Sequence, residues 1–462
     1  MNPALKIPRI VIGATGSGVG KTTVTVAILG ALRARGLNVA AFKCGPDYLD
    51  PTYHARALGR PSQNLDGWMM GREGVLATFA RAAAGADIAV IEGVMGLFDG
   101  ATPISDEGST AEIAKWLEAP VIVVCDAYGI ARTVSAIAAG FARFDPSLNV
   151  AGLICNRVGS RGHLDLLHAA KPELRILGGF PRNDELAFPE RHLGLRTADH
   201  DSISDEKFAA WRRLAEEWID LDALIALARA TSTLPDVTAS ENREEPRVQC
   251  KIGIAHDDAF HFYYTNNLRR LESLGAELVY FSPVTQKTLP AVDGLYFGGG
   301  YPEVLAQELA ANRAMLDAIR AFALRGSPIY AECGGLMYLA DGIKTLDGIT
   351  HRMVGLVPGI AVMRDRLQAL GYVEVETRAA SILGPAGTKF RGHQFRYSML
   401  DRDGDARGVE EIYRVAPRWG GVSFTEGYRA GNVLASYVHA HWASNPRVAE
   451  GLITSCVRAR TR

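Results

Sequence analysis

Apolar and polar positions alternate in blocks along the first half of the chain, where short apolar runs are separated by longer stretches of mixed character. The apolar runs are Arg9–Gly13, Asn38–Lys43, Ile88–Glu92, Val121–Cys125 and Val150–Asn156. Near-continuous apolar runs of this kind are typical of strands buried on both faces of a parallel sheet. The stretches between them, such as Thr22–Arg35 and Ala111–Leu117, have the spacing of helices. This alternation predicts an α/β domain with a doubly wound parallel sheet.

The pattern changes at residues 231–249, which are polar, charged and proline-containing, and which we interpret as a linker. Beyond the linker new apolar runs begin, at Lys251–Ala255, Glu277–Phe281, Gly294–Phe297, Pro328–Ala331 and Val433–Val438. We therefore expect two α/β domains in series, one over residues 1–230 and one over residues 250–462.

Charge and length narrow the classes of function. The chain has 462 residues, and its 50 lysines and arginines balance 51 aspartates and glutamates, so no overall field attracts nucleic acid or a membrane surface. No apolar run reaches the roughly 18 residues of a membrane span, and the N-terminus lacks the pattern of a signal peptide. The six cysteines form no CxxC pair and no zinc-spaced cluster. We expect a cytoplasmic protein with free thiols and small-molecule partners, and a homodimer is compatible with the sequence.

A glycine-rich segment over residues 13–23, GATGSGVGKTT, follows a predicted strand and opens a predicted helix. Its backbone N–H groups and the helix N-terminus form a cradle for phosphate, Lys21 can reach the β- and γ-phosphates, and the Thr22 hydroxyl can bind Mg²⁺. The loop departs from the strict pattern because Thr15 stands where glycine is usual. We predict an ATP site that contains Gly16, Gly18, Gly20, Lys21, Thr22 and Thr23.

Polar side chains stand where three of the following strands end, and these are Lys43, Asp47, Asp50, Glu92, Asp99 and Asn156. Because ligands bind at the carboxyl ends of strands in open α/β sheets, we expect these side chains to converge near the phosphates. The carboxylates would bind Mg²⁺, with Asp47 and Glu92 assigned to the metal and Asp50 and Asp99 to the substrate, although the division between them stays open. Lys43 would neutralise phosphate or substrate charge. The Asn156 amide would read a purine edge or cap a loop.

A second candidate site surrounds Cys333, which lies in PIYAECGGLMYL between a predicted strand and a predicted helix. The following glycines permit a sharp turn that exposes the sulfur, and the helix start would lower the pKa of the thiol. The motif GGGYPE at residues 298–303 would supply oxyanion donors from Gly299 and Gly300. The segment ASYVHAHW offers His439 or His441 as a base.

These residues resemble known families. ECGGL and YVH resemble class I glutamine amidotransferase domains, in which cysteine and histidine hydrolyse glutamine through a thioester. The resemblance implies Cys333 as nucleophile and His439 as base. Those domains often carry glutamate two residues after the histidine, where this chain has His441, so a dyad or an orienting group elsewhere is implied. The phosphate loop, Lys43 and Glu92 resemble the dethiobiotin synthetase fold, which activates a carboxyl group with ATP.

The fused pair, with KCGPDYLDPTYH, EGVMGLFDG, GGGYPE, ECGGLMYL and GHQFRYS, resembles the cobyrinate a,c-diamide synthase family over nearly the whole chain. That resemblance implies ATP- and Mg²⁺-dependent amidation of the a and c acetate groups of a corrinoid, with L-glutamine as nitrogen donor. Tyr53, His54 and His393 are weaker candidates for substrate or domain-interface contacts.

Two alternatives stay open. Hydrogenobyrinate or a nickel sirohydrochlorin would present similar acetate groups. No residue pattern in the sequence indicates which metal, if any, the tetrapyrrole carries. A rival of another class is an assembly ATPase with a phosphate loop whose second domain is an inactive docking module. That class usually carries a signature lysine early in its loop, where this chain has Gly16.

Overall fold

The computed structural model describes residues 6–183, 203–234, 247–402 and 408–460. The chain divides into two compact units, Met1–Glu241 and Asn242–Arg462, each of which is described by itself. Most of the linker predicted at residues 231–249 lies outside the described residues. Among the described residues, no helix is both long enough and apolar enough to cross a membrane.

The described strands of the first unit form one parallel sheet in the order β3-β2-β4-β1-β5-β6-β7. Their bounds are β1 (Arg9–Ala14), β2 (Val39–Cys44), β3 (Gln63–Leu65), β4 (Ile88–Glu92), β5 (Val121–Asp126), β6 (Val150–Val158) and β7 (Ile176–Pro181). The order reverses beside β1, which is the switch point where a doubly wound sheet leaves room for a ligand. The predicted fold class is confirmed, and the five predicted strands begin and end within two residues of the observed ones.

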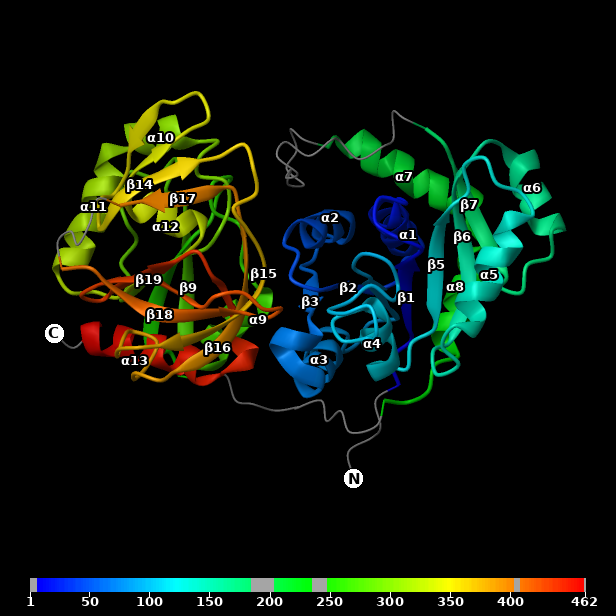
Figure 1. The fold of residues 1–462 in the computed structure, drawn as a ribbon, viewed down its shortest axis with the longest axis horizontal. Helices are drawn as coiled ribbons and strands as arrows, with labels where there is room; N and C mark the ends of the chain where they lie inside the picture. Colours follow the sequence, from blue (N-terminus) through cyan, green and yellow to red (C-terminus); the bar gives the residue numbers. More distant parts are fainter. Residues whose placement is uncertain (1–5, 184–202, 235–246, 403–407, 461–462) are drawn as a thin grey trace. The chain divides into compact units, whose positions relative to one another are not determined.

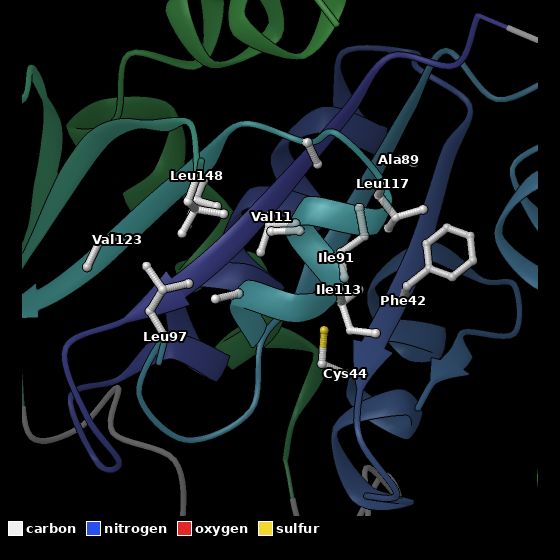
Figure 2. Packing of buried hydrophobic residues seen from close by; sticks show 14 of the residues in the cluster. Val11, Phe42, Cys44, Ala89, Ile91, Leu97, Ile113, Leu117, Val123 and Leu148 are labelled. Carbon is white, nitrogen blue, oxygen red and sulfur yellow. The ribbon is translucent and has the colours of Figure 1, made fainter. Parts of the chain in front are cut away.

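Helices cover both faces of this sheet (Figure 1). They are α1 (Lys21–Ala34), α2 (Leu49–Leu58), α3 (Gly67–Ala82), α4 (Thr110–Trp116), α5 (Thr133–Arg143), α6 (Arg161–Ala169), α7 (Asp205–Trp218) and α8 (Leu221–Arg229). Residues of α3 to α6 share one buried cluster with alternate positions of the strands. Figure 2 shows Val11, Phe42 and Ile91 of that cluster together with Ile113 and Leu117 from the α4 segment. Helix α1 packs against α7 and α2 on the other face.

The second unit is built on a mixed sheet in the order β21-β16-β15-β18-β19-β20-β11-β10-β8-β9 among its described strands. The five strands from β20 to β9 are parallel, and the remaining neighbours pair antiparallel. Their bounds are β8 (Cys250–Ala255), β9 (Ala276–Phe281), β10 (Gly294–Phe297), β11 (Ile329–Glu332), β15 (Ala369–Thr377), β16 (Lys389–Arg396), β18 (Glu410–Pro417), β19 (Phe424–Ala430), β20 (Val433–Ser436) and β21 (His439–His441). The parallel half was expected from the sequence, whereas the antiparallel extension was not.

A smaller sheet, in the order β13-β12-β14-β17, adjoins the large one within this unit. Its strands are β12 (Ala340–Lys344), β13 (Thr350–Arg352), β14 (Val357–Met363) and β17 (Ser398–Asp401). The helices of the unit are α9 (Thr265–Ser273), α10 (Ala306–Ala311), α11 (Arg313–Leu324), α12 (Gly334–Leu339) and α13 (Arg447–Arg460), together with the short 3-10 helix η3 (Trp442–Ser444). Strand β11 ends at the residue before Cys333, and α12 begins at the residue after it.

Candidate functional sites

The phosphate loop joins β1 to α1, and its glycines are required by backbone shape and by close packing. Gly18 and Gly20 have φ of 77° and 90°, which lie in the left-handed region that favours glycine. A Cβ at Gly20 would lie 2.0 Å from Nδ2 of Asn156. That amide nitrogen donates a hydrogen bond of 2.8 Å to the carbonyl of Val19. The amide nitrogen of Asn156, predicted to read a purine or cap a loop, therefore supports the phosphate loop from the end of β6.

Beside the loop, cationic and anionic side chains from the ends of β2 and β4 and from the first turns of α1 and α2 meet in a buried network. Lys43 Nζ lies 2.6 Å from Asp50 Oδ2 and 3.1 Å from Glu92 Oε1. The Thr22 hydroxyl donates to Glu92 Oε1 at 2.7 Å, and Lys21 Nζ lies 3.6 Å from the same oxygen. The structure thus brings together five of the residues that the sequence predicted for this site.

Burial and charge oppose each other at these groups. Burial alone would raise the pKa of Glu92, but the charges of Lys43 and Lys21 and the hydrogen bond from His54 hold it well below its usual range. Burial would lower the pKa of Lys43, yet the nearby carboxylates raise it. Asp47 differs, because burial and the charge of Asp50 raise its pKa to about 6. The network therefore keeps Lys43 and Glu92 ionised away from water.

Three predicted substrate residues lie outside the cleft lining. His54 is fully buried on α2, where its Nε2 lies 2.6 Å from Glu92 Oε2, so it contacts the network from beneath. Tyr53 is also buried, with 1% of its surface exposed. Asp99 accepts a hydrogen bond of 2.9 Å from the N–H of Gly96 and so holds the turn after β4. His54 therefore contacts Glu92 of the network, Asp99 contacts the turn after β4, and Tyr53 lies buried next to His54 on α2.

A cleft of about 870 Å³ opens over the phosphate loop. Its lining includes the predicted Lys43, Asp47 and Asp50, and four residues that the sequence had not indicated. These four are Asp126, Tyr128, Arg157 and Arg182.

The four residues join the ends of β5, β6 and β7 into one wall. The guanidinium of Arg157 lies 2.5 Å from Asp126 and donates to the carbonyl of Gly18 at 2.8 Å. The guanidinium carbon of Arg182 lies 5.3 Å from the centre of the Tyr128 ring. These four residues could have been found from the sequence in the same way as Lys43 and Glu92, because each of them ends or follows a parallel strand.

Whether Mg²⁺ fits this site can be judged from the oxygens present. Within the described residues, no group of three or more histidine, cysteine, aspartate or glutamate side chains is arranged to hold a metal unaided. Mg²⁺ in nucleotide sites usually takes one or two protein oxygens and completes its shell with phosphate and water. Oxygens at neighbouring positions of such a shell lie about 3 Å apart. The 2.7 Å separation of Thr22 Oγ1 and Glu92 Oε1 fits that requirement.

In the second unit, Cys333 occupies a strained turn between β11 and α12. Its φ of 47° and ψ of −101° lie outside the regions that side chains usually adopt, as in the nucleophile elbows of hydrolases. Its N–H donates to the carbonyl of Ser436 at 2.7 Å. A Cβ at the next residue, Gly334, would lie 2.9 Å from Pro302 and 3.1 Å from the nitrogen of Gly300. Glycine is therefore required where the chain leaves the turn.

The predicted base His439 begins β21 and is enclosed by aromatic and glycine residues. Its ring stacks on that of His393 at 5.0 Å between centres, and His393 Nδ1 lies 2.9 Å from the Tyr264 hydroxyl. A Cβ at Gly299 would lie 2.5 Å from Cε1 of His439, so the GGGYPE segment packs directly on the imidazole. His441 instead accepts a weak hydrogen bond from Ala443 and caps η3.

The expectation that the helix start lowers the pKa of the Cys333 thiol is wrong for this structure. Burial, with a further contribution from the charge of Glu303, raises that pKa to about 12. Burial also lowers the pKa of His439 to about 3. In this environment the thiol and the imidazole are both neutral at pH 7.

One predicted oxyanion donor is already engaged. The N–H of Gly299 donates to the carbonyl of Phe262 at 3.2 Å. The other, Gly300, lies against Gly334, because a Cβ at Gly334 would come within 3.1 Å of the Gly300 nitrogen. Gly334 had not been singled out as a donor, although its place directly after Cys333 was a usable signal. The backbone nitrogens of Gly300 and Gly334 thus come together beside Cys333.

Comparison with known families assigns both halves of the chain. The model described as a CobQ/CobB/MinD/ParA nucleotide binding domain matches residues 10–195. The model described as a CobB/CobQ-like glutamine amidotransferase domain matches residues 251–447. The first match contains the phosphate loop and the Lys43–Glu92 network, and the second contains Cys333 and His439.

Similar proteins match over almost their entire length. A cobyrinate a,c-diamide synthase of Leptospira interrogans is 53% identical over 454 residues, covering 98% of this chain and 99% of that protein. Proteins of the same name from Syntrophotalea carbinolica and Priestia megaterium are 46% and 40% identical and cover 98% of this chain. They are themselves covered to 99% and 98%. The similarity therefore includes both units.

Proposed function

The chain belongs to the cobyrinate a,c-diamide synthase family, and we propose that it amidates the a and c acetate carboxylates of cobyrinate through acyl-phosphate intermediates. As a member it is a carbon–nitrogen ligase that uses glutamine for amidation in cobalamin biosynthesis, with a nucleotide-binding and an amidotransferase domain. The proposal divides the work: the first unit activates the carboxylate with ATP, and the second releases ammonia from glutamine.

In the first unit, the loop N–H groups and Lys21 bind the phosphates of ATP. Thr22 and Glu92 would hold Mg²⁺, which when bound would neutralise phosphate charge. An acetate oxygen of the substrate attacks the γ-phosphorus, the bond to the ADP oxygen breaks, and an acyl phosphate forms. Lys43, which is kept charged by its two carboxylates, stabilises the negative charge in that step. Ammonia then attacks the acyl carbon and phosphate leaves.

In the second unit, His439 takes the proton of the Cys333 thiol as the sulfur attacks the side-chain carbonyl of glutamine. The N–H groups of Gly300 and Gly334 face the oxyanion that develops. His439 returns the proton to the departing nitrogen, ammonia is released, and a thioester remains. Water hydrolyses the thioester to glutamate and restores the thiol. The observation that carries this proposal is the Cys333 elbow within the same chain as the buried network around the phosphate loop.

The test separates the two nitrogen sources. In Cys333→Ala, glutamine-dependent amidation is expected to be lost, while amidation driven by ammonium salts continues near the wild-type rate. Lys21→Ala is the matched variant of the other unit and is expected to lose both. Product mass with cobyrinate should rise in two steps, each replacing a hydroxyl by an amino group. If Cys333→Ala retained glutamine use, or if a folded Cys333→Ala lost ammonia use, the proposed division of work would be wrong.

A further inference from the structure

Glu332 directly precedes the nucleophile, ends β11, and is 1% exposed. One of its carboxylate oxygens accepts hydrogen bonds from the N–H of Ala440 at 3.0 Å and from the Tyr330 hydroxyl at 2.8 Å. The other accepts from the Tyr296 hydroxyl at 3.0 Å. Ala440 is the residue next to His439. The side chain of the residue before Cys333 therefore contacts the residue after His439.

Glu332 is already the register partner of Ser436 in β20, and its hydrogen bond to Ala440, four residues further along the chain, extends this contact to β21. In the order of the described strands, five strands lie between β11, which leads to Cys333, and β21, which carries His439. No ladder of backbone hydrogen bonds joins these two strands, since β21 pairs with β16 and β11 pairs with β10 and β20. The Glu332–Ala440 hydrogen bond thus crosses between strands that the sheet itself does not pair.

A buried carboxylate lowers the stability of the fold unless hydrogen-bond donors compensate for the water that its charge has lost. Glu332 has three donors around it, and burial still raises its pKa to about 7. The Tyr296 hydroxyl donates to the oxygen that does not contact Ala440, and so keeps the other oxygen directed at the Ala440 N–H. An apolar side chain would fill the same volume without holding Ala440.

We propose that Glu332 is a positioning residue of the glutaminase reaction, which holds His439 in place relative to Cys333 through the N–H of Ala440. This inference rests on the proposed function of Cys333 and His439. Class I amidotransferase domains often use a glutamate to orient the histidine, but this chain has His441 at that position. Glu332 would take over part of that role, because it holds the backbone of β21 through the Ala440 N–H.

The test compares Glu332→Ala with Glu332→Gln. Glutamine can still accept the Ala440 N–H through its amide oxygen, whereas alanine cannot. For Glu332→Ala, kcat with glutamine is expected to fall about 10- to 100-fold, the effect of losing one hydrogen bond in a buried site, with KM for glutamine changed less than about twofold. Glu332→Gln is expected to recover most of the loss. Ammonia-dependent amidation by the other unit serves as the folding control and should stay unchanged.

Tyr330→Phe is the matched control, because it removes a partner of the same carboxylate oxygen and leaves the Ala440 hydrogen bond. It is expected to keep most of the glutamine-dependent kcat. The proposal is overturned if Glu332→Ala retains wild-type kcat, if Glu332→Gln is as poor as Glu332→Ala, or if Tyr330→Phe loses as much as Glu332→Ala. Any of these can occur while Cys333→Ala still behaves as proposed above, so a failure here is distinguishable from failure of the Cys333 assignment.

Discussion

Lys43→Met tests whether the buried charge network beside the phosphate loop carries the first half of the reaction. Lys43 Nζ lies 2.6 Å from Asp50, 3.1 Å from Glu92 and 2.8 Å from the carbonyl of Gly93. Its side chain is 3% exposed, and those of Asp50 and Glu92 are 5% and 0% exposed. Methionine fills a similar volume but leaves two buried carboxylates without their shared cation.

Removing one partner of a buried ion pair costs about 3–5 kcal/mol, because a charge stays buried without compensation. For a unit of this size, that predicts a fall of about 6–20 °C in its unfolding midpoint. The deficit depends on pH. The depressed pKa of Glu92 contributes stability above its unfolded value of about 4.3, and that contribution is lost as pH falls through the folded value. Without Lys43, burial is expected to raise the pKa of Glu92 above its unfolded value, so ionised Glu92 destabilises the variant as pH rises above about 4.3 and the deficit is larger at pH 8 than at pH 5.5.

The assay is thermal unfolding of the full chain at pH 8 and at pH 5.5, together with ammonia-dependent amidation. Lys115→Met is the control, because Lys115 also bridges two carboxylates, Asp106 and Asp145, but is one-quarter exposed. Exposed pairs contribute about 0–1 kcal/mol, so this variant should stay near wild type in both measurements. Equal effects of the two substitutions, or a Lys43→Met deficit that does not shrink at pH 5.5, would refute the reasoning.

Three further predictions follow from the packing of single residues. Gly20→Ala, which directs a Cβ to within 2.0 Å of Asn156, should abolish amidation with either nitrogen source, measured as product mass. Gly299→Ala places a Cβ 2.5 Å from His439 and should reduce only glutamine-dependent turnover, so a parallel loss with ammonia would contradict it. Because the pKa of Cys333 is about 12, its alkylation by iodoacetamide without glutamine should accelerate about tenfold per pH unit between pH 7 and 9, followed by peptide mass spectrometry. A rate independent of pH would show a thiol that is already ionised.

The parallel halves of both sheets were predictable because a strand buried on both faces reads as an unbroken apolar run. The same rule predicted the convergence of Lys43, Asp50 and Glu92, since it places functional groups at the carboxyl ends of such strands. The antiparallel extension of the second unit's sheet was not predictable in this way. Strands such as Lys389–Arg396 and Glu410–Pro417 carry charged residues on an exposed face, so their apolar positions do not form a run.

The roles of individual polar residues were harder to predict than their neighbourhood. His54 was expected to meet substrate, but the sequence does not show that Ser62 and Glu92 enclose its ring. The thiol pKa was expected to be low because the local motif shows a helix start, whereas burial depends on distant strands. Local spacing thus predicts which atoms come to a site, and the tertiary structure decides their ionisation.

The two sites manage buried charge in opposite ways, and the difference suits their chemistry. The first site keeps Lys43 and Glu92 ionised by pairing them, which would give the proposed phosphoryl transfer fixed charges before ATP binds. The second leaves Cys333 and His439 neutral, since the pKa of the thiol is raised and that of the imidazole is lowered. In the proposed reaction, a thiolate–imidazolium pair would therefore be unfavourable until the sulfur attacks the glutamine carbonyl. The proposed glutaminase reaction therefore requires Cys333 and His439 to be correctly placed before glutamine binds, and does not require them to be charged. The hydrogen bond from the Ala440 N–H to Glu332 would hold His439 in that place.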